Sequence, residues 1–69
     1  MKPTLLKPGR QVRCDGRAMT FGRRDRAGGA QPAVNVFQCE DYRGLNGPAD
    51  KGICTMTDAR VARHVEAVS

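Results

Sequence analysis

Five arginines gather in one stretch of the sequence and could bind phosphate groups. They are Arg13, Arg17, Arg23, Arg24 and Arg26. A guanidinium can donate two parallel hydrogen bonds to one phosphate. Residues 1–26 hold eight basic and two acidic side chains, a net charge of +6, whereas residues 27–69 carry −1. This polarity predicts weak, sequence-independent binding of RNA or single-stranded DNA, and the competing interpretation is a solvated basic surface.

Three cysteines and one histidine could ligate a metal or form a nucleophile–base pair. They are Cys14, Cys39, Cys54 and His64. Structural zinc sites usually bring their ligands in close pairs, and the sequence has no C-x₂₋₄-C spacing. An odd number of cysteines without a signal-like apolar stretch at the N-terminus argues against a secreted disulfide framework. We therefore expect reduced, buried thiols, a cytoplasmic protein, and no metal or other cofactor.

Sequence motifs for catalysis are missing. The chain contains no G-x-x-x-x-G-K-[ST], G-x-G-x-x-G, G-x-S-x-G or H-E-x-x-H. Its one serine is Ser69, so a serine nucleophile is effectively excluded. Glu40 and Asp41 form an acidic pair, but two carboxylates without further oxygen ligands make a poor cation site. The sequence predicts a binding protein and no enzyme.

A second class of function is a protein-interaction module. Both phenylalanines, Phe21 and Phe37, carry the apolar area that a small core needs, which leaves Tyr42 as the aromatic expected to be partly exposed. The loop over residues 41–52 could contact a protein partner, and so could an exposed sheet edge. Its candidate residues are Tyr42, Arg43, Leu45 and Asn46. Nucleic acid and protein thus stay alternative partners of a monomer or weak homodimer.

The elements that must position these residues are mostly short strands. Strands are predicted over residues 10–14, 17–23, 33–40 and 53–57, separated in part by loops over 24–32 and 41–52. Asp15-Gly16 between the first two strands is a strong signal for a type I′ hairpin turn. Residues 33–40 carry apolar side chains on both faces, which is typical of a central strand.

The last segment, residues 59–68, fits two structures. Val61, Val65 and Val68 are spaced i, i+4, i+7, which predicts a helix capped by Thr57 or Asp58. As a strand, the segment would place Arg63 on the same face as two valines, although valine itself favours strands. The periodicity favours the helix, and a fifth strand stays the alternative.

Sixty-nine residues make one small domain with a marginal core. We expect an irregular lead-in over residues 1–9 and one β-rich domain over residues 10–69. The predicted fold is mostly β, or α+β if the last segment is a helix: a small curved antiparallel sheet or an SH3-like barrel of four to five strands with a short C-terminal helix. The expected core consists of Val12, Met19, Phe21, Val34, Val36, Phe37, Ile53, Met56, Val61 and Val65. The sequence has no apolar run of about 18 residues, so no membrane segment is predicted.

The first third of the chain resembles a known family. Pro8-Gly9, Val12 and Gly16-Arg17 resemble the opening strand and turn of SH3-like small barrels of the KOW type. The chain length also suits that family. The resemblance implies a small β-barrel whose partners would be RNA, ribosomal components or peptides.

Overall fold

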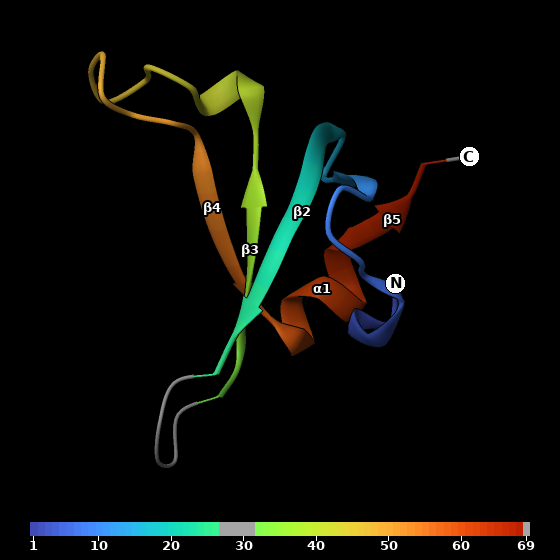
Figure 1. Cartoon of the computed structure of the whole chain (residues 1–69). Helices are drawn as coiled ribbons and strands as arrows, with labels where there is room; N and C mark the ends of the chain where they lie inside the picture. Colours follow the sequence, from blue (N-terminus) through green and yellow to red (C-terminus); the bar gives the residue numbers. More distant parts are fainter. Residues whose placement is uncertain (27–31, 69) are drawn as a thin grey trace.

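Residues 1–26 and 32–68 are described by a computed structural model, which shows one open antiparallel sheet and a short helix (Figure 1). The strands run in the order β4-β3-β2-β1-β5. Their bounds are β1 Gln11–Cys14, β2 Arg17–Asp25, β3 Val34–Gln38, β4 Ile53–Thr57 and β5 Val65–Ala67, with helix α1 at Asp58–His64 and 3-10 turns η1 at Pro3–Leu5 and η2 at Glu40–Tyr42. The predicted small antiparallel sheet with a short C-terminal helix is confirmed.

The hairpin between β1 and β2 follows from its two turn residues. Asp15 has a φ of 51° and Gly16 a φ of 85°. A type I′ turn requires positive φ at both central positions, which Gly, Asn and Asp adopt more readily than other residues. The turn sets Cys14 opposite Arg17 and Val12 opposite Met19. The predicted hairpin is therefore confirmed.

Strand β3 is central, as its two apolar faces predicted. It pairs with β2 on one side and with β4 on the other. Phe37 lies opposite Phe21, and the two rings meet edge to face with centroids 5.5 Å apart. The register shifts after Phe21, so that Gly22 is the extra residue of a bulge and Arg23 lies opposite Val36.

Strand β2 is longer than predicted. Arg24 and Asp25 were expected in a loop but lie in the strand, opposite Asn35 and Val34. The ladder with β3 continues past the bulge, and its backbone hydrogen bonds outweigh the weak strand preference of these charged residues. Residues 27–31 of the predicted loop lie outside the described part of the chain.

The C-terminal segment contains both alternatives in succession. The Thr57 hydroxyl accepts a hydrogen bond from the Arg60 backbone N–H at 3.3 Å and so caps α1. The helix ends at His64, and Val65 becomes extended and pairs with Cys14 of β1. The helix prediction is correct up to His64 and wrong beyond it, because pairing with the edge of β1 replaces helical hydrogen bonds.

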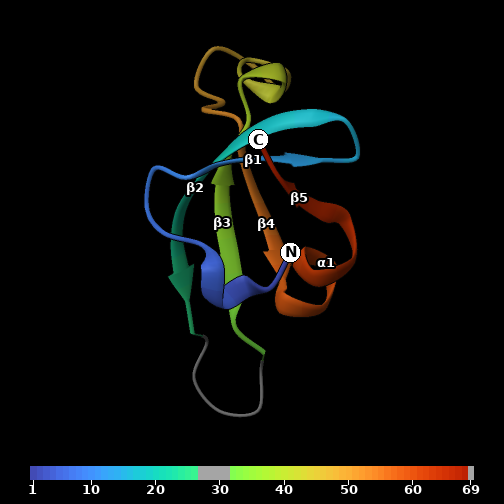
Figure 2. The ribbon, with the colours of Figure 1, turned by 90° about the vertical axis from the view of Figure 1, so that its right-hand side faces the viewer.

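The core lies between the sheet and α1, with the η1 turn beside the helix (Figure 2). Ile53 was predicted to be a core residue, but it is 54% exposed because Cys54 and Met56 take the inward face of β4. Val34 is only half-buried, and Val36, although buried, lies on the opposite face from Phe37 and outside the core cluster. The members of the cluster are Leu6, Val12, Cys14, Met19, Phe21, Phe37, Cys39, Met56, Val61 and Val65.

Residues 1–9, expected as a lead-in, also contribute to the packing. Leu6 is buried in the core cluster, and Met1 packs against it. The Met1 nitrogen donates to the Val65 carbonyl oxygen at 2.8 Å and to the Ala62 carbonyl oxygen at 3.3 Å. The described helices include none that is long and apolar enough to cross a membrane.

Candidate functional site

The five arginines of the predicted phosphate site do not share one face of the sheet. Val12 and Cys14 point into the core, so Arg13 between them lies on the solvent face. The bulge in β2 places Arg23 on this face, opposite Val36. Arg24 follows on the core side. The strand alternation therefore separates side chains that are neighbours in the sequence.

Three of these arginines are paired with carboxylates. Arg23 Nε lies 3.0 Å from Oδ1 of Asp25, and Arg24 forms an ion pair with Asp58. Exposed pairs of this kind stabilise a fold by only about 0–1 kcal/mol, but each one cancels a positive charge.

The third pair joins the two candidate sites. Arg17 Nη1 lies 3.6 Å from Oδ2 of Asp41, and the Arg17 guanidinium carbon lies 5.2 Å from the centre of the Tyr42 ring. This distance is typical of a cation–π contact. Tyr42 is half-buried. Through this contact, Arg17 of the predicted phosphate site packs on the loop that was predicted to bind a protein.

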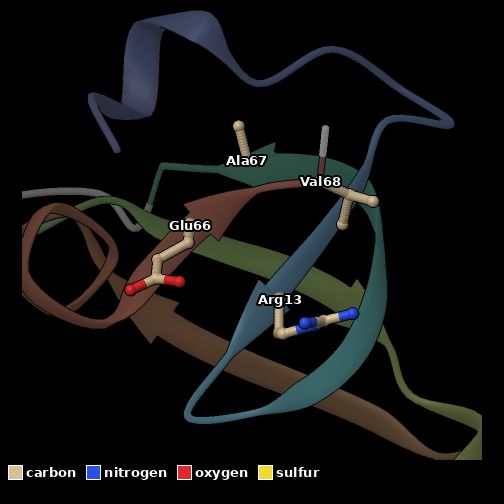
Figure 3. A pocket seen from close by; sticks show the side chains of 4 residues that line it. All are labelled: Arg13, Glu66, Ala67 and Val68. Atoms are coloured by element: carbon tan, nitrogen blue, oxygen red, sulfur yellow. The ribbon is translucent and has the colours of Figure 1, made fainter.

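Arg13 and Arg26 are exposed, and within residues 1–26 and 32–68 neither has a salt bridge. Glu66 of β5 lies opposite Arg13 in the register. Figure 3 shows the two side chains pointing away from one another at a pocket that Ala67 and Val68 also line. One cation beside one anion and two small apolar groups does not make a phosphate clamp.

The other residues of the predicted protein site stabilise the loop before β4 or are exposed on it. Arg43 Nη1 lies 3.6 Å from Oε2 of Glu40. The Asp50 carboxylate accepts hydrogen bonds from the backbone N–H groups of Gly52 at 2.9 Å and Asn46 at 3.2 Å, and these bonds lower the pKa of Asp50. Leu45 is 69% exposed, an isolated apolar group on this loop.

The sequence predicted that all three thiols are buried, which is correct for Cys14 and Cys39 in the core and wrong for Cys54. Burial raises the pKa of the Cys14 thiol, and the neighbouring Asp15 carboxylate raises it further. Cys54 is half-buried. His64 Nδ1 lies 3.3 Å from Oδ1 of Asp15. Across the described residues, no group of three or more His, Cys, Asp or Glu side chains could hold a metal ion.

Strand β4 forms an exposed edge of the sheet. The sequence predicted such an edge but not which strand would form it. β4 is the last strand of the sheet and pairs only with β3 within the described chain (Figure 1). Its sequence, Ile-Cys-Thr-Met-Thr, contains neither a charge nor a proline. Natural proteins usually protect edge strands with lysine, proline, bulges or short length. β4 has none of these protections.

The hydrogen-bond pattern shows which groups of β4 are unpaired. The Cys39 N–H donates to the Gly52 carbonyl oxygen at 2.8 Å, one register step before β4 begins. Hydrogen-bonded pairs alternate along an antiparallel ladder, so Cys54 and Met56 bond to β3. The N–H and C=O groups of Ile53 and Thr55, and the N–H of Thr57, therefore point away from the sheet.

Gly52 fixes this register. Its φ of 75° is in the left-handed region, and a Cβ there would overlap the Cys39 carbonyl oxygen. A glycine is thus required where the loop enters β4.

Comparison of the chain with protein-family models, curated proteins and solved structures finds no match.

Proposed function

We propose that this chain is a small protein-interaction domain that accepts an extended partner segment along the free edge of β4. The observation that supports it is the uncharged, proline-free edge of five residues, Ile53–Thr57, whose outward backbone groups are unpaired within the described chain. Strand addition to such an edge supplies main-chain hydrogen bonds, and alternate side chains supply specificity. This is the interaction module that the sequence left as an alternative.

The side chains of β4 agree with this proposal. Ile53, Thr55 and Thr57 are exposed on one face, and β-branched residues favour strand pairing. On the opposite face, Cys54 is half-buried and packs against the core cluster. An added strand would place its own side chains beside those of β4 on both faces. The proposal includes no catalytic step, since Cys14 and Cys39 are buried and His64 contacts Asp15.

The test uses a synthetic peptide of residues 52–58 as the added strand, titrated into the isotope-labelled protein. We expect chemical-shift changes centred on Ile53, Thr55 and Thr57 and slower hydrogen exchange of their amides. The matched control is a peptide N-methylated at the residue corresponding to Thr55, which cannot donate at the centre of the new ladder. Equal binding of both peptides, or no change in β4 at a peptide concentration of about 1 mM, would contradict strand addition.

Phosphate binding is a second candidate because part of the N-terminal charge is unpaired. Lys7, Arg10 and Arg13 are exposed and have no acidic partner within residues 1–26 and 32–68. If single-stranded RNA binds, Arg13→Gln lowers the salt slope of log K by about one unit, whereas Arg23→Gln lowers it less because Asp25 already pairs with Arg23. Equal slopes for both variants would contradict this assignment.

A further inference from the structure

The free edge of β4 is complementary to itself. We propose that the strand it accepts is β4 of a second copy of this chain, antiparallel to the first and related to it by a two-fold axis at Thr55. This inference rests on the proposed function and names the partner. It predicts a closed dimer in which the two sheets join into one.

Four of the five outward backbone groups of β4 find partners in this arrangement, and the Ile53 N–H does not. Thr55 lies opposite Thr55 of the second copy, and Ile53 opposite its Thr57. Each Thr55 N–H then donates to the other Thr55 carbonyl, and each Thr57 N–H donates to an Ile53 carbonyl. The Thr57 carbonyl is not needed, because a residue at the N-cap already accepts the first bond of its helix. The outward donors of Thr55 and Thr57 and the acceptors of Ile53 and Thr55 thus find partners.

The side chains also match. The two Thr55 side chains become cross-strand neighbours on the exposed face, and threonine pairs stabilise such positions. Cys54 lies opposite Met56 of the second copy on the core side. Cys54 is half-buried in the single chain and packs against the core cluster, so the contact continues that apolar surface.

Charge favours the antiparallel orientation. Both copies carry a net charge of +5, but β4 itself is uncharged, so no charged side chain of the strand meets its like. Asp50 and Lys51 precede the strand, and Asp58 and Arg60 follow it. In the antiparallel pair, the end of β4 that Asp50 and Lys51 precede lies near the start of α1 in the second copy, which carries Asp58 and Arg60. A parallel pair would bring identical charges together.

The other edge of the sheet does not compete for this contact. Strand β5 has three residues, carries Glu66 at its centre, and has the Met1 nitrogen bonded to the Val65 carbonyl oxygen. Both short length and charge disfavour edge pairing. Since β4 pairs with its own copy, the contact is isologous and closes at two chains instead of growing into a filament.

The experiment is sedimentation velocity of the full chain from about 10 µM to about 1 mM, because an interface smaller than ~1,200 Å² dissociates readily. We expect a concentration-dependent dimer. Thr55→Lys places two lysines opposite each other and raises the dissociation constant about tenfold or more. Gln11→Lys, an exposed position on β1, adds the same charge away from β4 and leaves the dimer unchanged.

A mixed sample of labelled and unlabelled protein tests the register. We expect an intermolecular nuclear Overhauser effect between the Hα atoms of Cys54 and Met56, which oppose each other in a non-hydrogen-bonded pair with Cα atoms about 4.5 Å apart. A protein that stays monomeric to about 1 mM, or a dimer that Thr55→Lys does not weaken, overturns the inference. If the 52–58 peptide still binds β4 of such a monomer, strand addition stands and only the self-pairing fails.

Discussion

The two edges of the sheet differ in length, charge and covering. β4 at one edge has five residues without a charge, and its outward backbone groups are unpaired within the described chain. β5 at the other edge has three residues with Glu66 in the middle, and Met1 bonds to its first carbonyl. Because an unprotected edge pairs readily with other chains, this asymmetry supports the proposal that a partner strand adds to β4 and not to β5.

The arginines of the predicted phosphate site differ from β4 in the same way, because most of them already have partners within the chain. Arg17, Arg23 and Arg24 contact carboxylates of their own chain, two of them from distant segments. Their positive charges are therefore neutralised by acidic side chains of the same chain. The backbone of β4, in contrast, has outward polar groups that are unpaired within residues 1–26 and 32–68, and the proposed interaction surface lies there.

Truncation of Phe37, the phenylalanine of β3 opposite Cys54 of β4, should have the largest effect on stability. Phe37 is fully buried and lies between Phe21 and Cys54 in the register. We expect Phe37→Ala to lower the free energy of unfolding by about 3–5 kcal/mol, which is most of the stability of a small domain. Chemical denaturation followed by circular dichroism measures it. Survival of the β1–β5 pair in the variant would show that the two edges fold independently.

A smaller effect is expected from the buried amide at the end of β4. Asn35 Nδ2 donates to the Met56 carbonyl oxygen at 3.2 Å and to Oδ1 of Asp58 at 2.8 Å. Asn35→Ala should cost about 1–3 kcal/mol, because it removes the bond to a carboxylate and leaves a small cavity. Arg24→Gln removes the exposed partner of the same carboxylate and should cost less than about 1 kcal/mol. Equal losses would mean that the amide does not hold this end of the strand.

The residue that ends β4 also starts the helix that leads to β5. Thr57→Ala should cost about 1 kcal/mol, because the backbone N–H of Arg60 loses its capping acceptor. Thr57→Ser keeps the hydroxyl and should recover most of the loss. Thermal denaturation of the three proteins measures the difference. An alanine variant as stable as the parent would show that the Thr57 cap does not stabilise the helix that links β4 to β5.

The smallest effect concerns the loop that leads into β4. Hydrogen bonds from Gly52 and Asn46 lower the pKa of Asp50, so its carboxylate should titrate below the usual range of aspartate. The stabilisation is present above the unfolded-state pKa and is lost as the pH falls through the folded-state pKa. Carboxyl carbon shifts against pH measure the titration, and the Asn46 and Gly52 amides should follow it. In Asp50→Asn these amides should not follow pH, and titration of Asp50 above the usual range would contradict the bonding.

The sequence by itself determined the elements that depend on local chemistry. Asp15-Gly16 required a type I′ turn, and the alternation of residues 53–57 predicted β4 with its observed bounds. A helix cap was predicted at Thr57 or Asp58, and Thr57 is the one observed. Each of these features is set by backbone preferences or side-chain periods within a few residues. The buried Cys14 and Cys39 followed from the same patterns.

Only the tertiary structure decided how distant residues meet. The helical period of Val61 and Val65 continued past His64, but pairing with Cys14 of β1 made Val65 a strand residue. The bulge at Gly22 put Arg23 and Arg24 on opposite faces, and the contact of Arg17 with Tyr42 joins residues far apart in the sequence. Strand order made β4 an edge, since which strand lacks a neighbour depends on every pairing in the sheet and not on the local sequence of that strand.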